Sequence, residues 1–128
     1  MQHNPVGWFE IYVQDMHRAR AFYEAVFQIQ LSPLPFDGAE LLAFPMPSQD
    51  TYAQTPGATG ALIRLPGCPS GGSGTLVYFS CEDCALELER ALKNGGQLHR
   101  GKISIGQYGF IALVVDTEGN LIGLHSMR

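Results

Sequence analysis

Hydrophobic and polar residues alternate strictly near the start of the chain. Residues 7–13 place Phe9, Ile11 and Val13 on one side and Trp8, Glu10 and Tyr12 on the other. A period of two in aromatic and β-branched residues predicts a β-strand. One face of this strand is apolar, and the opposite face carries aromatic rings around a single carboxylate.

The period then changes to that of a helix. Asp15 is a good N-cap, because its carboxylate can accept a hydrogen bond from an amide of the first helical turn. The predicted helix spans 16–27, and its apolar stripe consists of Met16, Ala19, Phe22, Tyr23, Val26 and Phe27. We expect this stripe to pack on the apolar face of the first strand, which leaves Glu10 on the other face.

A less regular region follows the helix. Short strands are predicted near 29–34, 40–44 and 61–65, with an irregular loop over 47–59, because prolines and glycines punctuate this part of the chain. The run 67–73 is rich in glycine and serine and is predicted to be a linker.

After the linker the order of elements repeats. A strand is predicted over 75–80, then a helix that Glu82 and Asp83 open and Asn94-Gly95-Gly96 ends. Strands near 97–102, 110–115 and 121–125 complete the chain, with a turn over 116–120. The fold class is therefore α+β, a single domain (1–128) of two βαβββ modules (1–66 and 74–128). We expect these modules to form paired curved sheets around a cavity that Trp8, Glu10 and Tyr12 face.

The composition of the chain argues against two classes of binding partner. The chain is 45% hydrophobic and 16% charged, with a formal net charge of −4, as expected for an ordinary globular domain. It has no run of lysine or arginine, so neither nucleic acid nor an anionic membrane is an expected partner. The polar start and the lack of a long apolar segment favour a cytoplasmic protein without a signal peptide or membrane span.

The three cysteines allow a second kind of chemistry. An odd number argues against a secreted disulfide framework. Cys81 and Cys84 form a CxxC motif at a strand-to-helix junction, where a thiol pKa is often lowered, so a redox role is an alternative to an ordinary structural role. A zinc site is not supported, because the remaining cysteine, Cys68, lies in the linker.

Several segments together resemble one family. The first strand ends in Asp15, and its helix contains Phe22-Tyr23 and Val26-Phe27. In the second half, 93–96 resembles a helix stop and 116–122 a closing hairpin. In order and spacing these segments resemble the vicinal oxygen chelate superfamily, which includes glyoxalases, bleomycin-resistance proteins and extradiol dioxygenases. The resemblance covers nearly the whole chain and implies the glyoxalase/bleomycin-resistance fold.

The resemblance also implies where a metal would bind. Enzymes of the superfamily hold a divalent metal with His, Glu or Gln side chains at cavity-facing strand positions. The corresponding residues here are Trp8, Leu76 and Gly123, and the strand at 61–64 offers no ligand either. Because these side chains cannot donate a lone pair to such a cation, we expect no metal and no other cofactor. This pattern resembles a metal-free branch of the superfamily.

Five residues are candidates for the functional site. Glu10 and His125 lie two residues from lost ligand positions, so both are expected to face the cavity. They are interpreted as a catalytic acid–base pair or an improvised metal pair. The structural alternative is a Glu10 bonded to a neighbouring strand and a half-exposed His125. Trp8, Tyr12 and Tyr78 are predicted to line a ligand pocket, with plain core packing as the alternative.

These observations leave three hypotheses for function. The leading one is metal-independent binding of a small molecule in the cavity between the modules. The second is an isomerase or lyase, similar to lactoylglutathione lyase, that uses Glu10 as a general base. The third is a drug-sequestering resistance protein. In each case we expect a homodimer, because exposed sheet edges are usually paired or covered.

Overall fold

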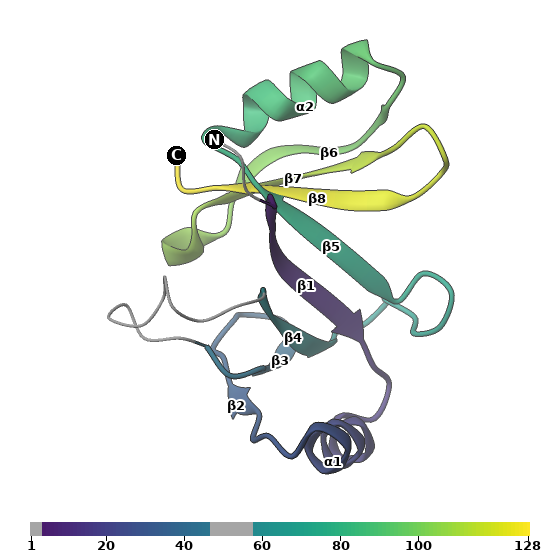
Figure 1. Cartoon of the computed structure of the whole chain (residues 1–128), viewed down its shortest axis with the longest axis vertical. Coiled ribbons are helices and arrows are strands. Elements are labelled where there is room, and N and C mark those ends of the chain that lie inside the picture. The colour runs from purple at the N-terminus through teal and green to yellow at the C-terminus, as the bar shows by residue number, and fades with distance from the viewer. Residues whose placement is uncertain (1–3, 47–57) are drawn as a thin grey trace. The chain divides into compact units, whose positions relative to one another are not determined.

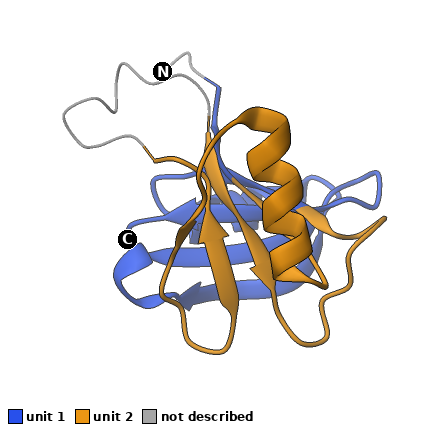
Figure 2. Ribbon diagram, turned by 90° about the horizontal axis from the view of Figure 1, so that it is seen from below, with its two compact units in different colours: residues 1–8, 76–128 blue, residues 9–75 orange. Residues whose placement is uncertain are grey.

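A computed structural model describes residues 4–46 and 58–128 of the chain. Most of the predicted irregular loop over 47–59 therefore lies outside the described residues. The chain divides into two compact units (Figure 2). Unit 2 is Phe9–Thr75, and unit 1 combines Leu76–Arg128 with the residues up to Trp8. The boundary falls within the first strand, β1 (Val6–Tyr12).

Unit 2 contains the first helix and the strands that follow it (Figure 1). Its elements after β1 are α1 (Met16–Phe27), β2 (Ser32–Pro33), β3 (Glu40–Ala43) and β4 (Thr59–Arg64). The strands lie in the order β2-β3-β4-β1, and β3 runs antiparallel to β4, with Leu42 opposite Leu62. The strand predicted at 29–34 shrinks to two residues, because Pro33 and Pro35 have no amide to donate.

The first helix begins where the sequence predicts. Asp15 is extended (φ −130°) and its carboxylate accepts a hydrogen bond of 3.0 Å from the amide of Arg18. The helix ends at Gln28, which adopts the left-handed conformation with φ 54°. That conformation stops the helix, because it turns the chain out of the helical path.

The core of unit 2 confirms part of the predicted strand–helix packing. Its buried residues are Val13, Met16, Leu31, Leu42 and Leu62, and Ile11, Ala19, Tyr23, Ile29 and Phe44 pack against them. Phe9 contacts Phe44 edge-to-face, with ring centroids 5.1 Å apart. The apolar face of β1 therefore does meet the helix, as the alternation of residues predicts.

The predicted helix stripe is wrong at three positions. Phe22, Val26 and Phe27 are 59%, 54% and 59% exposed. The cause lies on the other flank of the helix, where Glu24 accepts a hydrogen bond from the Leu31 amide (2.8 Å) and Arg20 donates to the Leu31 carbonyl (3.2 Å). These two bonds to the buried Leu31 hold the side of the helix that carries Arg20 and Glu24 toward the core. The side that carries Phe22 and Val26 is therefore left in solvent.

Unit 1 contains the second set of elements: β5 (Thr75–Ser80, except its first residue), α2 (Cys84–Lys93), β6 (Gln97–Ser104), the short 3-10 helix η2 (Gly106–Tyr108), β7 (Phe110–Val115) and β8 (Leu121–Ser126). Its strand order is β5-β8-β7-β6, with β5 parallel to β8 and the other pairs antiparallel. The buried core consists of Cys84, Ala112, Val114 and Leu124. Each half of the chain thus has the predicted order βαβββ, and the α+β fold class is confirmed.

Both ends of α2 also follow from the sequence. Asp83 accepts a hydrogen bond of 3.0 Å from the Ala85 amide, and Gly95 beyond the helix has a φ of 99°. Within the described residues no helix is long and apolar enough to cross a membrane.

Three aspartates are expected to make the stability of the fold depend on acid pH. Amide donors lower the pKa of Asp15 (from Arg18) and of Asp116 (from Asn120 and Glu118), and the Lys102 ammonium lowers that of Asp83. Since the folded pKa values lie below the unfolded value of about 3.9, the stabilisation is complete above about pH 5 and is lost as the pH falls through the folded values.

We therefore expect the urea midpoint to be steady between about pH 7 and 5 and to fall below about pH 4. Asp83→Asn should reduce this acid-sensitive loss, because the amide cannot titrate. Urea titrations at several pH values measure both effects. A midpoint that stays constant down to about pH 2.5 would contradict the assignment.

Candidate functional site

The best-supported polar feature is a pair of side chains on β1. The Tyr12 hydroxyl donates a hydrogen bond of 2.7 Å to Oε1 of Glu10, and both residues are half-buried. The bond shows that the two side chains lie on the same face of the strand, as a period of two requires. A carboxylate has about four lone-pair positions, and the bond from Tyr12 uses one of them.

The end of β1 is held in place by the last residue of β4 and by the chain that follows it. The Tyr12 amide donates to the Gly74 carbonyl (2.7 Å), and the Gln14 side chain donates to the Cys68 carbonyl (3.2 Å). Arg64 donates from Nε to the Gln14 carbonyl at 3.2 Å. These bonds fix the backbone that carries Tyr12, and through the phenol they restrain Glu10.

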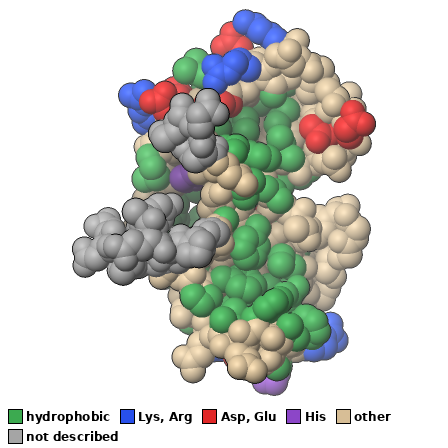
Figure 3. All heavy atoms as spheres, in the orientation of Figure 1, with side chains coloured by type: hydrophobic (Ala, Val, Ile, Leu, Met, Phe, Trp, Pro, Cys, Tyr) green, Lys and Arg blue, Asp and Glu red, His purple; other side chains and the backbone are tan. Residues whose placement is uncertain are grey.

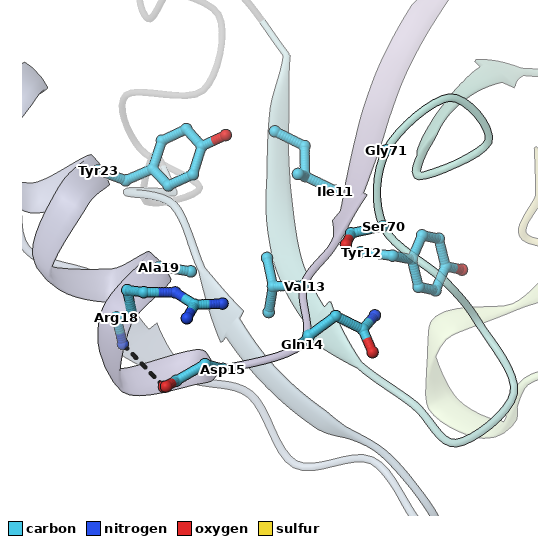
Figure 4. Close-up of a pocket in the computed structure, with 10 residues that line it drawn as sticks. All are labelled: Ile11, Tyr12, Val13, Gln14, Asp15, Arg18, Ala19, Tyr23, Ser70 and Gly71. Carbon is cyan, nitrogen blue, oxygen red and sulfur yellow. Dashed lines mark hydrogen bonds between the residues drawn. The ribbon is translucent and has the colours of Figure 1, made fainter.

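A small hollow opens beside this end of β1, within unit 2 (Figure 4). Its volume is about 290 Å³, just below the range of about 300–1,000 Å³ that is usual for ligand pockets. Ile11, Val13, Ala19 and Tyr23 supply its apolar lining, and Tyr12, Gln14, Asp15, Arg18 and Ser70 its polar one. The start of α1 thus brings Arg18 and the capping residue Asp15 to the rim.

Among the polar lining residues, the sequence predicted only Tyr12 as a ligand contact and missed Gln14, Asp15, Arg18 and Ser70. Gln14 could have been found by extending the alternation two residues beyond Tyr12. No local signal pointed to Ser70, because it lies in a segment whose composition predicts only a linker.

In unit 1, Tyr78 lies against Gly123. The two residues are paired across the parallel strands β5 and β8. Tyr78 is 6% exposed, and a Cβ atom built on Gly123 would overlap its ring. The glycine is therefore required by the tyrosine, since any side chain at position 123 would compete with the ring for the same space.

His125 is held by the backbone. Its Nε2 lies 2.6 Å from the carbonyl oxygen of Tyr108, and the ring is half-buried. Because a carbonyl oxygen only accepts, Nε2 carries the proton in this bond and Nδ1 is the nitrogen that can act as a base. Among the other predicted site residues, Trp8 and Tyr78 belong to unit 1 with His125, whereas Glu10 and Tyr12 belong to unit 2.

The metal positions implied by the family resemblance do not suit a cation. Trp8 and Leu76 have no suitable donor atom, and the space at Gly123 belongs to the Tyr78 ring. In the parts of the chain that the structure describes, no three His, Cys, Asp or Glu residues are grouped closely enough to hold a metal ion. The residues present at these positions therefore do not fit the divalent metal of the superfamily's enzymes.

The CxxC motif lacks the electrostatics of a redox site. Burial, and then the nearby Glu87 carboxylate, raise the pKa of the Cys81 thiol to about 11, and Cys84 is fully buried. The expectation of a lowered thiol pKa is therefore wrong. Desolvation and a neighbouring negative charge both disfavour the thiolate, and they outweigh the effect of the junction with α2.

Cys81 should accordingly react slowly. At about pH 7.5 we expect iodoacetamide to label it at least about 10-fold more slowly than a free cysteine, after allowing for the higher nucleophilicity of a high-pKa thiolate. Glu87→Gln should accelerate the labelling, since it removes a charge that raises the pKa. Peptide mass spectrometry measures the rate, with urea-unfolded protein as the control. Labelling of folded Cys81 at the rate of the unfolded control would contradict this assignment.

Solved structures with the same fold include proteins of several kinds. A hypothetical protein from Bacillus halodurans C-125 matches with a TM-score of 0.70 and 11% identity, over 96% of this chain and 94% of that one. Methylmalonyl-CoA epimerase from Mycobacterium tuberculosis matches with a TM-score of 0.67 and 16% identity, over 97% and 88%. A methylmalonyl-CoA epimerase from Streptomyces coelicolor, in complex with 2-nitronate-propionyl-CoA, matches with a TM-score of 0.64 and 14% identity, over 95% and 96%.

At these identities the similarity establishes the fold alone. No curated protein matches the chain. The model of the Glyoxalase/Bleomycin resistance protein/Dioxygenase superfamily, however, matches residues 6–124, which is nearly the whole chain. The order βαβββ in each half agrees with that match. The chain belongs to the glyoxalase/bleomycin resistance protein/dioxygenase superfamily, as the resemblance to vicinal oxygen chelate proteins implies.

Proposed function

We propose that this chain binds a small molecule without a metal ion and that Glu10 and Tyr12 form the polar part of the binding surface. The observation that carries the proposal is the hydrogen bond of 2.7 Å between the Tyr12 hydroxyl and Glu10. The bond holds a half-buried carboxylate in one orientation on a strand whose end is itself anchored. A preorganised acceptor of this kind binds a donor at a lower entropic cost than a mobile one does.

The chemistry of this face favours a particular type of ligand. The carboxylate accepts hydrogen bonds or attracts a cation, and the rings of Trp8 and Tyr12, on either side of Glu10 along β1, suit a flat or apolar group. The ligand would therefore combine a donor or cationic group with an apolar body. In unit 1 the sequence predicts ligand contacts at Tyr78 and His125, and these two roles remain predictions.

A second candidate function is an isomerase or lyase that uses Glu10 as the general base. The adjacent Tyr12 hydroxyl favours it, because a phenol beside a carboxylate can donate a hydrogen bond to an oxygen that gains charge. Methylmalonyl-CoA epimerases share the fold, which makes acyl thioesters reasonable substrates to test. Exchange of a thioester α-proton in heavy water would support this candidate, and Glu10→Gln should abolish the exchange.

Glu10→Gln tests the binding proposal, since it keeps the shape of the side chain and removes the charge. Trp8 is the single tryptophan and lies two residues from Glu10, so its fluorescence reports on ligands at this face. We expect at least one class among organic cations, hydroxy acids and acyl thioesters to bind the wild type, and at least about 10-fold more weakly to the variant, the loss of about 1.4 kcal/mol expected for one charged hydrogen bond. Tyr12→Phe should weaken binding less.

The same variant separates a functional role from a structural one. If Glu10 serves binding, Glu10→Gln should change the free energy of unfolding by less than about 1 kcal/mol. A loss of more than about 2 kcal/mol would place the carboxylate in a buried structural network instead. Equal affinity of both proteins for every ligand class would also refute the proposal.

We also propose that the chain is a homodimer in solution. The expectation comes from the exposed edges of a small two-module fold. It does not depend on the identity of the ligand.

A further inference from the structure

The outer face of α1 is unusually apolar for a helix in contact with water. Its exposed residues are His17, Arg18, Ala21, Phe22, Ala25, Val26 and Phe27. Five of the seven are apolar, and both phenylalanines are 59% exposed. The opposite side of the same helix supplies Met16, Ala19 and Tyr23 to the core. A helix that is apolar on both sides is normally covered on both.

Hydrophobic side chains are exposed on the face of the molecule that Figure 3 shows. The outer face of α1 is complementary in shape to the same face of a second copy. Small and large side chains alternate along it: Ala21, Phe22, Ala25 and Val26. If a second α1 packs antiparallel so that Phe22 lies opposite Ala25 of the other copy, then Ala21 lies opposite Val26. Each large side chain meets a small one, which allows the helix axes to approach to about 8–10 Å.

Charge favours the same arrangement. Arg18 lies at the start of this face, and the last turn of α1 contains no basic residue. In an antiparallel pair, the Arg18 of one copy comes beside the last turn of the other, where the carbonyl groups lack partners within the helix and the helix dipole is negative. The other two charged groups of the helix, Arg20 and Glu24, bond to each other at 2.9 Å and do not compete.

We propose that α1 is the dimer contact of this protein and that it packs antiparallel against α1 of a second copy around a twofold axis. A twofold axis requires one surface to be complementary to itself. The outer face of α1 meets that requirement in both size and charge. The inference rests on the proposed homodimer, but it places the contact on α1 and not on the exposed sheet edges from which the sequence predicts the dimer.

Single substitutions on α1 test the contact. In sedimentation velocity at micromolar concentration we expect the wild type to be a dimer. Val26→Glu and Ala21→Lys should each weaken dimerisation at least about 10-fold, because each places an unpaired charge in an apolar contact. Leu98→Glu is the matched control. Leu98 is 58% exposed on β6, the last strand in the order of unit 1, so this variant should remain a dimer.

A mixing experiment tests the register. In a heterodimer of the Val26→Glu and Ala21→Lys proteins, one Glu–Lys pair forms and the second Ala–Val contact is intact. Mixing the two variants should therefore restore the dimer. Both substitutions are at exposed positions, so the circular dichroism spectra of the variants should match that of the wild type.

Three results would overturn the proposal: a monomeric wild type, a dimer that survives Val26→Glu and Ala21→Lys, or a dimer that Leu98→Glu dissociates. Failure to restore the dimer on mixing would overturn the register. Glu10 and Tyr12 are intact in all these proteins, so Trp8 fluorescence measures the ligand proposal separately.

Discussion

Gly123→Glu is expected to leave the chain largely unfolded. Glutamate is one of the residue types with which enzymes of this superfamily bind their metal, but here the Tyr78 ring occupies the space that its side chain would need. Overpacking a core usually costs about 1–3 kcal/mol, and an unpaired buried carboxylate adds several more. The sum is comparable with the typical total stability of a domain, about 5–15 kcal/mol.

Circular dichroism and urea unfolding measure this loss. Gly101→Glu is the matched control, because a Cβ atom at Gly101 meets nothing within 4 Å, so this variant should unfold close to the wild type. Tyr78→Ala should partly rescue Gly123→Ala, since the two side chains compete for one space and their effects should not add. A Gly123→Glu protein as stable as the wild type would show that position 123 is not closed to a ligand side chain.

Leu62→Ala is the second substitution with a large expected effect. Leu62 is fully buried on β4, opposite Leu42, in the core that α1 covers. Truncating a buried leucine removes transfer free energy and leaves a cavity, which together cost about 2–5 kcal/mol. Urea unfolding should show this loss of stability.

Leu86→Ala provides the comparison. Leu86 is 52% exposed on α2, so its truncation should change the stability by less than about 1 kcal/mol. Similar losses for the two variants would contradict the placement of Leu62 in the core.

Local sequence patterns were sufficient to predict most of the helices and strands. The capping aspartates Asp15 and Asp83 mark the starts of both helices, and the apolar segment 110–115 is a strand over its whole predicted length. These signals involve residues only a few positions apart. The solvent exposure of Phe22 and Val26 could not be predicted in this way, because it depends on the bonds from Arg20 and Glu24 to Leu31, beyond the end of the helix.

In the candidate site, too, contacts within one strand could be predicted from the sequence, whereas contacts between strands could not. Glu10 and Tyr12 share a face because they are two residues apart in one strand, and their hydrogen bond follows from that. The contact between Tyr78 and Gly123 depends on the register of two parallel strands, which no local pattern specifies. Likewise, the Ser126 hydroxyl accepts a hydrogen bond of 3.0 Å from the Cys84 amide at the start of α2, although the two residues lie 42 positions apart.

The central proposal is that this member of the superfamily binds its ligand without the superfamily's metal, because Trp8, Leu76 and Gly123 occupy the positions at which the family resemblance places the metal ligands. Elemental analysis by mass spectrometry tests it most directly. The purified protein is incubated with zinc, nickel, iron or manganese salts and then dialysed. We expect far less than one metal ion per chain in every case. One tightly bound ion per chain would contradict it and would make Glu10 and His125 the first residues to test as ligands.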